Sequence, residues 1–405
     1  MSIQLDLDFV KLNSIIESGT KDELDEFCNE NNLIIENNKI KYNGNAAEKA
    51  KFWDKYQHIR KILLNATFGS LSNPHCRFFD KRIGQSITLT GRAITKHMIS
   101  QVNKEFTGEY NHTGKTYLYG DTDSVYFSAY GILKDEIESG EIQWDKDSVT
   151  KLYDYVSERV NLSFADFMKR AFHCPPEFSK PIAAGREIIG TVGLFITKKR
   201  YAIMVYDDEG KRRDVNGSPG KVKAMGLDLR RSDTPKYIQE FLSEILKMVL
   251  TKCSESAILE RIIEYRKEFR ELPPWRKGTP KSINKITWYR ENMQKGKKIT
   301  VPGHVRAGMN WNSLRAANSD NFSLEIVDGM KAVVCKLKNN PIGYTSIAFP
   351  TDETRLPEWF KELPFDEAHM EETILDSKLD NLIGKLGYDL ASTREINCFH
   401  NLFEF

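Results

Sequence analysis

The sequence KTYLYGDTDSVYFS, at residues 115–128, constrains the fold of this chain more than any other stretch. Aromatic and β-branched residues stand on both sides of a turn at residues 120–123, which predicts a β-hairpin. The turn holds two carboxylates, Asp121 and Asp123, two positions apart. Close like charges repel each other, whereas a hard cation such as Mg²⁺ binds carboxylate oxygens and offsets the repulsion. Two interpretations stay open here: a metal-binding hairpin, or an ordinary turn in which Asp is favoured for its backbone hydrogen bonds.

Length and composition bound the remaining possibilities. A chain of 405 residues exceeds one ordinary core, so two or three structural units are expected. No apolar run approaches the roughly 18 residues that a membrane span requires, so no membrane partner is expected. The six cysteines form no CxxC pair, which disfavours a zinc knuckle and is typical of a reducing cytoplasm. The net charge of +2 neither indicates nor excludes nucleic-acid binding, because local basic patches decide that.

Upstream of the hairpin, the sequence predicts one helix over residues 46–68 that ends at Gly69, and a short hairpin over residues 33–42 before it. Apolar residues of the last helical turns share one face, which is expected to pack on the core: Ile59, Ile62, Leu63 and Ala66. A second set, at i, i+4 and i+7, projects from the opposite face: Lys61, Asn65 and Phe68. The alternative for this second face is a solvated surface with one exposed ring.

Two motifs carry a family resemblance. The stretch RKILLNATFG, residues 60–69, resembles motif B, KxxxNxxYG, of family B DNA polymerases. The stretch YGDTDS, residues 119–124, resembles motif C of the same family, and the two motifs stand in the family's order about fifty residues apart. The text RFFDKRIGQSITLTGR, residues 77–92, most resembles replicative polymerases of T-even-like bacteriophages. The resemblance implies the C-terminal part of such an enzyme, acting in the cytoplasm of an infected bacterium.

The resemblance implies template-directed deoxynucleotidyl transfer by a two-metal mechanism, with two Mg²⁺ ions as cofactors. Asp123 would be a direct metal ligand, and Asp121 would support the coordination. Lys61 would contact the triphosphate of the incoming dNTP as a point charge. Asn65 and Phe68 would line the pocket of the new base pair. Because the family motif usually has tyrosine at the position of Phe68, a hydroxyl hydrogen bond would be lost while the stacking surface remains.

A run of cations followed by a tyrosine interrupts an apolar stretch: Lys198, Lys199, Arg200 and Tyr201. The pattern predicts that this run lies inside a strand, where buried cations are costly unless something anionic lies against them. The alternative is an edge strand that uses lysine against aggregation. By resemblance this is the family's KKRY segment, which contacts the primer–template duplex and whose second lysine, here Lys199, reaches the minor groove. Two further residues match acidic positions near the family's catalytic site: Glu187 and Asp207.

The last third begins with helical patterns. Thr234 is expected as the N-cap and Pro235 as the first residue of an amphipathic helix that extends to residue 249, and a second helix covers residues 259–269. A region rich in Lys and Arg follows: Arg276, Lys277, Lys281, Lys285, Lys295, Lys297, Lys298, His304, Arg306 and Arg315. It is interleaved with aromatic residues: Trp275, Trp288, Tyr289 and Trp311. Basic and aromatic residues together suit phosphate-backbone binding, and a solvated charged loop is the alternative.

The resemblance also covers the thumb segment HVRAGMNW, residues 304–311, in which Arg306 is the candidate DNA contact. At the end of the chain, an apolar and acid-containing tail spans residues 398–405. It resembles the phage polymerase tail that docks on the sliding clamp, with four candidate contacts: Phe399, Leu402, Phe403 and Phe405. The alternative is a terminal strand or helix that packs on its own domain.

These patterns together predict an α/β fold of the α+β kind. By resemblance, residues 1–72 form partial helical fingers, with the motif B helix at 46–69. Residues 73–226 form a palm with an antiparallel sheet and packed helices. Residues 227–405 form a thumb of mixed helices and strands.

The family's motif A, which supplies a further aspartate, is absent, and so are the acidic motifs of the 3′–5′ exonuclease. Asp6 and Asp8 lack the motif A continuation and are no substitute. The expectation is therefore the C-terminal subunit of a split polymerase that starts at its own Met1. A second, N-terminal polypeptide would contribute the exonuclease and one principal metal-binding carboxylate. Two alternatives stay open: a catalytically inactive protein that binds DNA and the sliding clamp, and another nucleotidyl-transfer enzyme such as a reverse transcriptase or terminal transferase.

Overall fold

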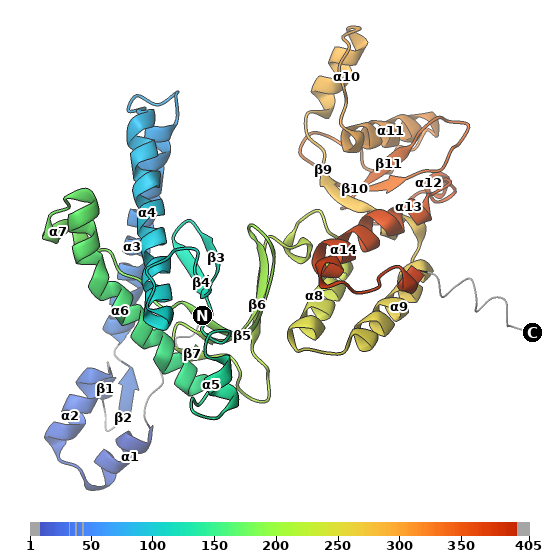
Figure 1. Ribbon diagram of the computed structural model, residues 1–405. Helices are drawn as coiled ribbons and strands as arrows, with labels where there is room; N and C mark the ends of the chain where they lie inside the picture. Colours follow the sequence, from blue (N-terminus) through green and yellow to red (C-terminus); the bar gives the residue numbers. More distant parts are fainter. Residues whose placement is uncertain (1–8, 32, 37–38, 43, 395–405) are drawn as a thin grey trace, which may run out of the picture. The chain divides into compact units, whose positions relative to one another are not determined.

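The computed structural model (Figure 1) describes residues 9–31, 33–36, 39–42 and 44–394. The chain divides into two compact units, residues 1–97 with 122–124 and residues 98–121 with 125–405. Helices alternate with small sheets, and the strands pair antiparallel in the sheets formed by β1–β2, by β5–β8 and by β9–β11. The predicted α+β class is confirmed, whereas the fingers, palm and thumb boundaries stay predictions. No helix in the described ranges is long and apolar enough to cross a membrane.

The first unit begins with a small helical and β substructure. Its elements are α1 (Phe9–Ser18), α2 (Lys21–Glu30), β1 (Leu33–Glu36) and β2 (Lys39–Tyr42). The antiparallel β1–β2 pair confirms the predicted hairpin. The two helices were not anticipated, although α2 starts with a capping box in which Thr20 and Glu23 satisfy each other's backbone N–H groups. A small apolar core joins these elements: Leu12, Phe27, Cys28 and Leu33.

Two long helices follow, α3 (Gly44–Ser72) and α4 (Lys81–Thr107). The predicted end of α3 at Gly69 is wrong, because the helix continues to Ser72; a glycine costs a helix only about 1 kcal/mol relative to alanine. The expected burial of one α3 face is also wrong. Every residue from 48 to 69 is exposed, including the apolar set that was assigned to the core: Ile59, Ile62, Leu63 and Ala66.

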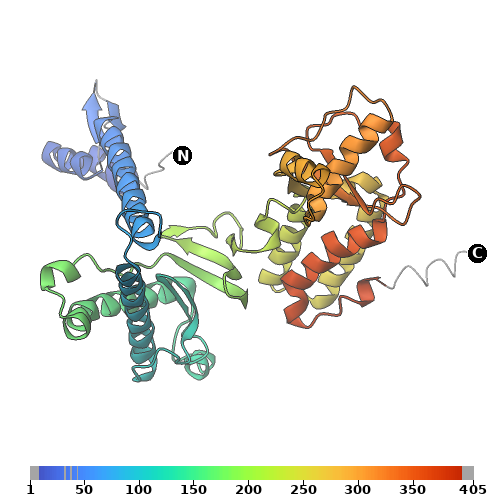
Figure 2. The same ribbon diagram turned by 90° about the horizontal axis from the view of Figure 1, so that it is seen from above.

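The second unit is built on a four-stranded antiparallel sheet. Its strands are β5 (Ile188–Thr197), β6 (Arg200–Asp208), β7 (Lys211–Arg212) and β8 (Lys221–Met225). Strand β6 pairs with all three others, and its residues 201–207 are buried. Successive side chains of a strand point to opposite faces, so burial throughout β6 means that both faces of the sheet are covered. The β5–β6 ribbon, in yellow-green, is seen in both views (Figures 1 and 2).

One face of β6 carries Ala202 and Met204, which pack in the largest core of the unit. Three helices complete that core: α8 (Lys236–Leu250), α9 (Glu255–Glu271) and α14 (Ser377–Ile383). Figure 2 shows α14, in red, alongside α8 and α9, in yellow. The predicted amphipathic face of α8 is confirmed, since Ile238, Phe241, Leu242, Ile245 and Leu246 are buried.

The predicted cap of α8 is wrong by one residue. Pro235 is the N-cap, and the helix starts at Lys236. Thr234 is buried, and its hydroxyl accepts a hydrogen bond from Lys378 at 3.0 Å instead of capping the helix. A contact with a residue distant in the chain therefore overrides the local capping signal.

The other face of β6 carries Tyr201, Ile203 and Val205, which pack with aromatic residues of the β3–β4 hairpin. This hairpin consists of β3 (Tyr117–Asp121) and β4 (Ser124–Phe127), as predicted. The helices between the hairpin and the sheet are α5 (Lys134–Glu138), α6 (Lys146–Phe172) and α7 (Pro176–Ser179). Val149 of α6 packs with Ile189 and Tyr206, so α6 covers the end of the sheet.

A second core lies beyond α9. A three-stranded sheet, β9 (Thr279–Ser282), β10 (Lys331–Lys336) and β11 (Ser346–Pro350), packs against α11 (Gly303–Ala317). Three short helices accompany it: α10 (Ile286–Gln294), α12 (Glu358–Lys361) and α13 (Glu367–Glu371), whereas η3 (Glu372–Asp376) packs in the first core. Two members of the predicted basic and aromatic surface are interior residues. Trp311 is fully buried, and Lys277 is buried in an ion pair with Glu367, so neither belongs to a phosphate-binding surface.

Candidate functional site

The tip of the β3–β4 hairpin presents two carboxylates. Asp121 is the last residue of β3, and Asp123 is exposed in the turn. Thr122 lies between them in the left-handed region, with φ at 59°. The hydroxyl of Thr95 on α4 donates a hydrogen bond to the carbonyl of Thr122 at 3.0 Å. This bond ties the tip of the turn to a long helix and so limits the motion of the segment that carries both carboxylates.

The base of the hairpin is anchored to α4 as well. The buried hydroxyl of Thr116 donates to Oδ1 of Asn103 at 3.2 Å, and the amide of Asn103 donates to the carbonyl of Glu109 at 2.9 Å. The N–H of Ser128 donates to the carbonyl of Thr116 at 2.9 Å and closes the strand pair. A buried and fully bonded amide of this kind makes the hairpin a rigid platform.

An aromatic cluster joins the hairpin to the sheet: Tyr119, Tyr126, Phe195 and Tyr201. The ring centroids of Tyr126 and Tyr201 are 5.2 Å apart, and their hydroxyl oxygens are 2.9 Å apart. Burial, helped by the hydrogen bond with Tyr201, raises the pKa of Tyr126 well above its usual value, so the Tyr126 hydroxyl stays neutral. Tyr201, predicted as a DNA contact, is therefore buried in this cluster, while Lys198 and Lys199 are exposed.

The expectation that Lys198 and Lys199 lie inside a strand is wrong. Thr197 pairs with Arg200, so the two lysines form the turn of the β5–β6 hairpin, where their charges stay in solvent. Lys199 has φ at 63°, which few side chains other than glycine adopt freely. Its backbone N–H donates to the hydroxyl of Tyr119 at 2.8 Å, and its Nζ lies 3.5 Å from Oδ1 of Asp121.

This geometry brings together two motifs about eighty residues apart in the sequence. The Lys199 amine faces the Asp121 carboxylate, and the Tyr119 hydroxyl fixes the turn that carries the lysine. The role of Tyr119 was missed, because no local pattern distinguishes it from the other hairpin aromatics. The arrangement therefore places a cation and a carboxylate side by side at the end of β3.

Gly226 is a second supporting residue that the sequence did not reveal. It has φ at 63°, and a Cβ at this position would lie 2.0 Å from the carbonyl oxygen of Lys199. The backbone after β8 therefore passes against the lysine turn so closely that only glycine fits. The side chain of Arg200 is held nearby, since its Nη2 lies 3.4 Å from Oδ2 of Asp228.

The two second-tier acidic residues are engaged in ion pairs. Asp207 is buried and pairs with Arg186, which also pairs with Asp154. The Asp207 carboxylate also accepts a hydrogen bond from the backbone N–H of Gly210 at 3.0 Å, so removal of Arg186 would leave a buried charge without its cation. Glu187 is exposed and lies 3.0 Å from the Nζ of Lys223. The structure thus gives Asp207 a structural partner and leaves the Glu187 side chain at the surface.

The remaining candidate residues are exposed or lie outside the described residues. Lys61, Asn65 and Phe68 are exposed along α3, and Arg306 is exposed on α11. The tail residues Phe399, Leu402, Phe403 and Phe405 lie outside the described residues. In the described ranges, no group of three or more His, Cys, Asp or Glu side chains is arranged to hold a metal ion.

Comparisons with known proteins identify relatives of this chain. The family model described as DNA polymerase family B matches residues 36–295. A protein named DNA-directed DNA polymerase from Enterobacteria phage T4 is 31% identical over 318 residues, which cover 74% of this chain and 33% of the relative. The protein of the same name from Escherichia phage RB69 is 31% identical over 313 residues, covering 72% of this chain and 32% of the relative. DNA polymerase 1 of Pyrococcus abyssi is 24% identical over 252 residues. The chain spans about a third of the length of the two phage relatives.

Proposed function

This chain belongs to DNA polymerase family B, and we propose that it carries the C-terminal part of a machinery for template-directed deoxynucleotidyl transfer on primer–template DNA. The observation that carries the proposal is the hairpin, which bears Asp121 and Asp123 two positions apart and in which the Asp121 carboxylate lies 3.5 Å from the amine of Lys199. Phosphoryl transfer depends on positioning and charge neutralisation, and this tip supplies both kinds of group on one anchored segment. As in its phage relatives, the setting would be an infected bacterial cytoplasm.

The carboxylate oxygens of Asp121 and Asp123 fit Mg²⁺, which prefers hard oxygen ligands. In this proposal Asp123 is a direct ligand and Asp121 supports the site. Two bound Mg²⁺ ions would stabilise the attacking and leaving oxygens of an in-line displacement. The amine of Lys199 lies 3.5 Å from the Asp121 carboxylate and offsets its charge. Because two carboxylates are few for two ions, a further carboxylate has to come from polypeptide beyond this chain.

The exposed residues of α3 suit the incoming dNTP. Lys61 offers a cation for the triphosphate, and Asn65 and Phe68 lie at i+4 and i+7 from it, on the same side of the helix. Lys198, Lys199 and Arg306 are exposed cations for the duplex backbone. Tyr201 would act by holding the turn rather than by touching DNA, since it is buried.

The partner is proposed to be an N-terminal polymerase and exonuclease polypeptide. The exposure of α3 over residues 48–69 supports it. The exposed apolar residues of α3, Ile59, Ile62 and Leu63 among them, form a surface that other polypeptide would cover. The partner would supply that cover together with the missing carboxylate. The tail at residues 398–405 is proposed to bind a sliding clamp.

Co-expression with the N-terminal polypeptide of a T4-like polymerase tests this proposal. The expected result is primer extension by the pair and none by this chain alone. Equal extension by the chain alone and by the pair would contradict the split arrangement. No extension by a pair that co-purifies as a stable complex would contradict the polymerase function itself.

A second candidate function is that of an inactive protein that binds DNA and the sliding clamp. The exposed cations of the β5–β6 turn and α11 favour DNA binding regardless of catalysis. Asp123→Ala in the reconstituted pair separates the two functions, with Asp352→Ala, an exposed residue elsewhere, as the matched control. Polymerase function predicts a loss of extension by at least about 100-fold for the first variant alone. Unchanged extension in both variants would favour a role in binding only.

A further inference from the structure

The turn of the β3–β4 hairpin belongs to the compact unit that contains the start of α4. Residues 122–124 are grouped with residues 1–97, whereas the hairpin residues up to Asp121 and from Val125 onward are in the second unit. Within the first unit the turn meets α4 through one side-chain hydrogen bond, from the hydroxyl of Thr95. The groups of α4 that touch the turn therefore bear on how firmly Asp123 is held.

Thr95 is half-buried on α4, and its hydroxyl has two acceptors. The hydroxyl oxygen lies 3.0 Å from the carbonyl oxygen of Thr122 and also 3.0 Å from that of Gly91, one helical turn earlier. The bond to Gly91 is the usual back-bond of a helical threonine, and it restricts the rotamer of the side chain. The hydroxyl reaches the turn from this same rotamer, so the contact with Thr122 requires no rearrangement of Thr95.

The backbone of Thr122 is the part of the turn that most needs support. Its φ of 59° lies in the left-handed region, which a β-branched residue seldom adopts because its side chain crowds the backbone. Such a conformation persists when the surrounding structure fixes it. The carbonyl of Thr122 and the N–H of Asp123 belong to one planar peptide group. A hydrogen bond at this carbonyl therefore sets the orientation of the peptide from which Asp123 starts.

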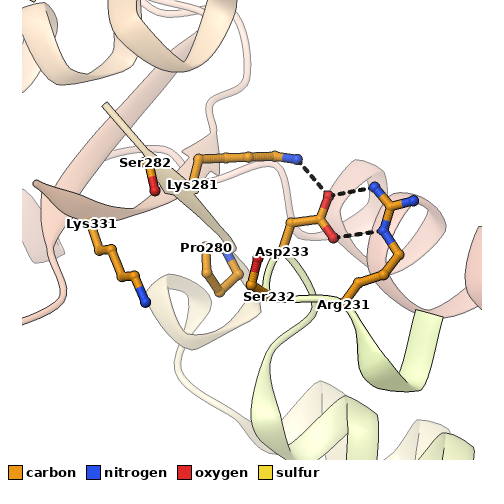
Figure 3. Close-up of a pocket in the computed structure, with 7 residues that line it drawn as sticks. All are labelled: Arg231, Ser232, Asp233, Pro280, Lys281, Ser282 and Lys331. Atoms are coloured by element: carbon orange, nitrogen blue, oxygen red, sulfur yellow. Dashed lines mark hydrogen bonds and ion pairs between the residues drawn. The ribbon is translucent and has the colours of Figure 1, made fainter. Parts of the chain in front are cut away.

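The position of the Asp123 carboxylate depends on this backbone. Figure 3 shows the opposite case in the loop before α8, where Asp233 accepts two hydrogen bonds from Arg231, at 3.0 and 3.1 Å, and one from Lys281 at 2.9 Å. Asp123 is exposed, and within the described ranges its side chain has neither an ion pair nor a hydrogen bond. Cations thus hold Asp233 in place, whereas the direction of the Asp123 side chain follows from the turn.

Helix α4 is a firm base for such a contact. It is one continuous helix over Lys81–Thr107. Its start packs closely on the end of α3, since the N–H of Asp80 donates to the carbonyl of Leu71 at 3.0 Å and a Cβ on Gly84 would lie 2.8 Å from Oγ of Ser72. A hydroxyl on a helix that is held in this way restrains the turn more than one on a mobile loop would.

We propose that Thr95 is a positioning residue for the metal-binding turn, whose hydroxyl holds the Thr122–Asp123 peptide in the orientation that lets Asp123 bind Mg²⁺. The inference rests on the proposed function and deepens it. Thr95 lies outside both motifs, since the motif B stretch ends at Gly69 and the motif C stretch begins at Tyr119. Without the hydroxyl, only a fraction of the turns has the binding orientation, and the apparent Mg²⁺ affinity falls by that fraction. One neutral hydrogen bond predicts a fall of about 3- to 10-fold.

The first test follows backbone amide hydrogen exchange of the hairpin, residues 117–127, in the isolated full chain. Thr95→Val keeps the shape of the side chain and removes the donor, so exchange should become about 3- to 10-fold faster. Thr95→Ser keeps the hydroxyl and should restore slow exchange. The matched control is Thr88→Val, because the Thr88 hydroxyl donates within its own helix, to the carbonyls of Gly84 and Gln85. Equal exchange in the wild type and Thr95→Val would overturn the proposal.

The second test uses the pair formed with the N-terminal polypeptide of a T4-like polymerase and titrates Mg²⁺ during primer extension. Thr95→Val should raise the Mg²⁺ concentration for half-maximal extension about 3- to 10-fold, and saturating Mg²⁺ should restore the rate. Thr95→Ser and Thr88→Val should behave as the wild type. An unaltered Mg²⁺ requirement in Thr95→Val, or a rate that saturating Mg²⁺ does not restore, would overturn the proposal and leave the proposed function standing.

The two tests also separate this inference from the function on which it rests. If the wild-type pair extends no primer, the proposed function fails, and hydrogen exchange in the isolated chain decides the role of Thr95. Faster exchange in Thr95→Val that Thr95→Ser reverses would still support a turn held by this hydroxyl. Faster exchange that Thr95→Ser does not reverse would indicate a packing role and overturn the inference.

Discussion

Helices α3 and α8 both carry several large apolar residues but differ in what covers them. In α8, Leu242, Ile245 and Leu246 are at most 1% exposed and pack with α9, α14 and the sheet. In α3, Leu63 is 60% exposed and Leu64 is 71% exposed. A leucine that is fully buried contributes about 1.5–3 kcal/mol relative to an exposed one, so α8 stabilises its unit and α3 gains little from its own apolar residues.

The difference separates a part of the chain whose apolar residues are buried from a part whose apolar residues are exposed. The sheet, α8, α9 and α14 form a closed core of buried apolar residues. Helix α3 carries the proposed nucleotide contacts yet lacks cover along residues 48–69. In the proposed function, duplex binding would therefore need this chain alone, while nucleotide transfer would need the partner. The following experiments test that contrast, from the largest expected effect to the smallest.

The largest effect is expected for Leu246→Ala in α8. Because Leu246 is fully buried, its truncation leaves a cavity and should lower the free energy of unfolding by about 2–5 kcal/mol. Leu63→Ala in α3 is the matched control, and it should change the free energy of unfolding by less than about 0.5 kcal/mol. Urea denaturation of the isolated chain measures both. Similar losses for the two variants would show that α3 is covered within this chain.

The next effect concerns the proposed partner. Leu63→Asp places a charge on the exposed apolar face of α3, so it should leave the stability of the isolated chain nearly unchanged. In the reconstituted pair it should lower primer extension about 10- to 100-fold, because a carboxylate would be buried without a counter-charge. Lys49→Asp, at an exposed polar position of the same helix, is the control for charge alone. Full extension by the Leu63→Asp pair would mean that this face is not covered by the partner.

Much of the local structure could be predicted from the sequence. The hairpin at β3–β4 and the buried face of α8 follow from short-range patterns, and the structure confirms both. The prediction that one face of α3 is buried was wrong. It rested on the helical spacing of the apolar residues from Ile59 to Ala66, and spacing alone does not show whether another element packs on them. A periodic pattern reports that a face is apolar, and only the rest of the assembly decides whether it is buried.

The sequence predicted the residues of the candidate site but not how distant segments bring them together. Asp121, Asp123 and Lys199 were predicted from motifs. The distance of 3.5 Å between Lys199 and Asp121, however, depends on the β5–β6 turn. The turn was mistaken for a strand interior, because apolar residues flank it on both sides and a two-residue turn of lysines has no glycine or proline signal. Gly226 was missed because its role comes from a close approach of distant backbone.

Gly226→Ala tests whether the lysine turn depends on that approach. The left-handed backbone alone should cost about 1–2 kcal/mol, and the contact with the Lys199 carbonyl should add to it. Gly210→Ala is the matched control, since Gly210 has φ at 81° but nothing within 4 Å of the added Cβ. Urea denaturation should give the larger loss for Gly226→Ala, and duplex affinity should fall for that variant only. Equal losses of stability and affinity would contradict the close approach.

The smallest effect is a pH dependence of the stability of the second unit. His304 lines a cavity with Lys281, Lys336, Lys378 and Asp233. Burial, with a smaller contribution from Lys281, lowers the pKa of His304 below its usual 6.5. The unfolded chain therefore takes up a proton near pH 6.5, while the folded chain does so only at lower pH. The stability contributed by neutral His304 is present above pH 6.5 and is lost as the pH falls through the lowered pKa.

Urea midpoints at about pH 7.5 and about pH 5.5 measure this loss. His304→Gln should reduce the difference between the two midpoints, because glutamine does not titrate. His112→Gln, at an exposed position of the same unit, should leave the difference as it is in the wild type. An unaltered difference in His304→Gln would show that the acid sensitivity arises at other groups. A reduced difference would place a pH-sensitive element in the closed core around β9 and β10, in the unit that the proposal assigns to duplex binding.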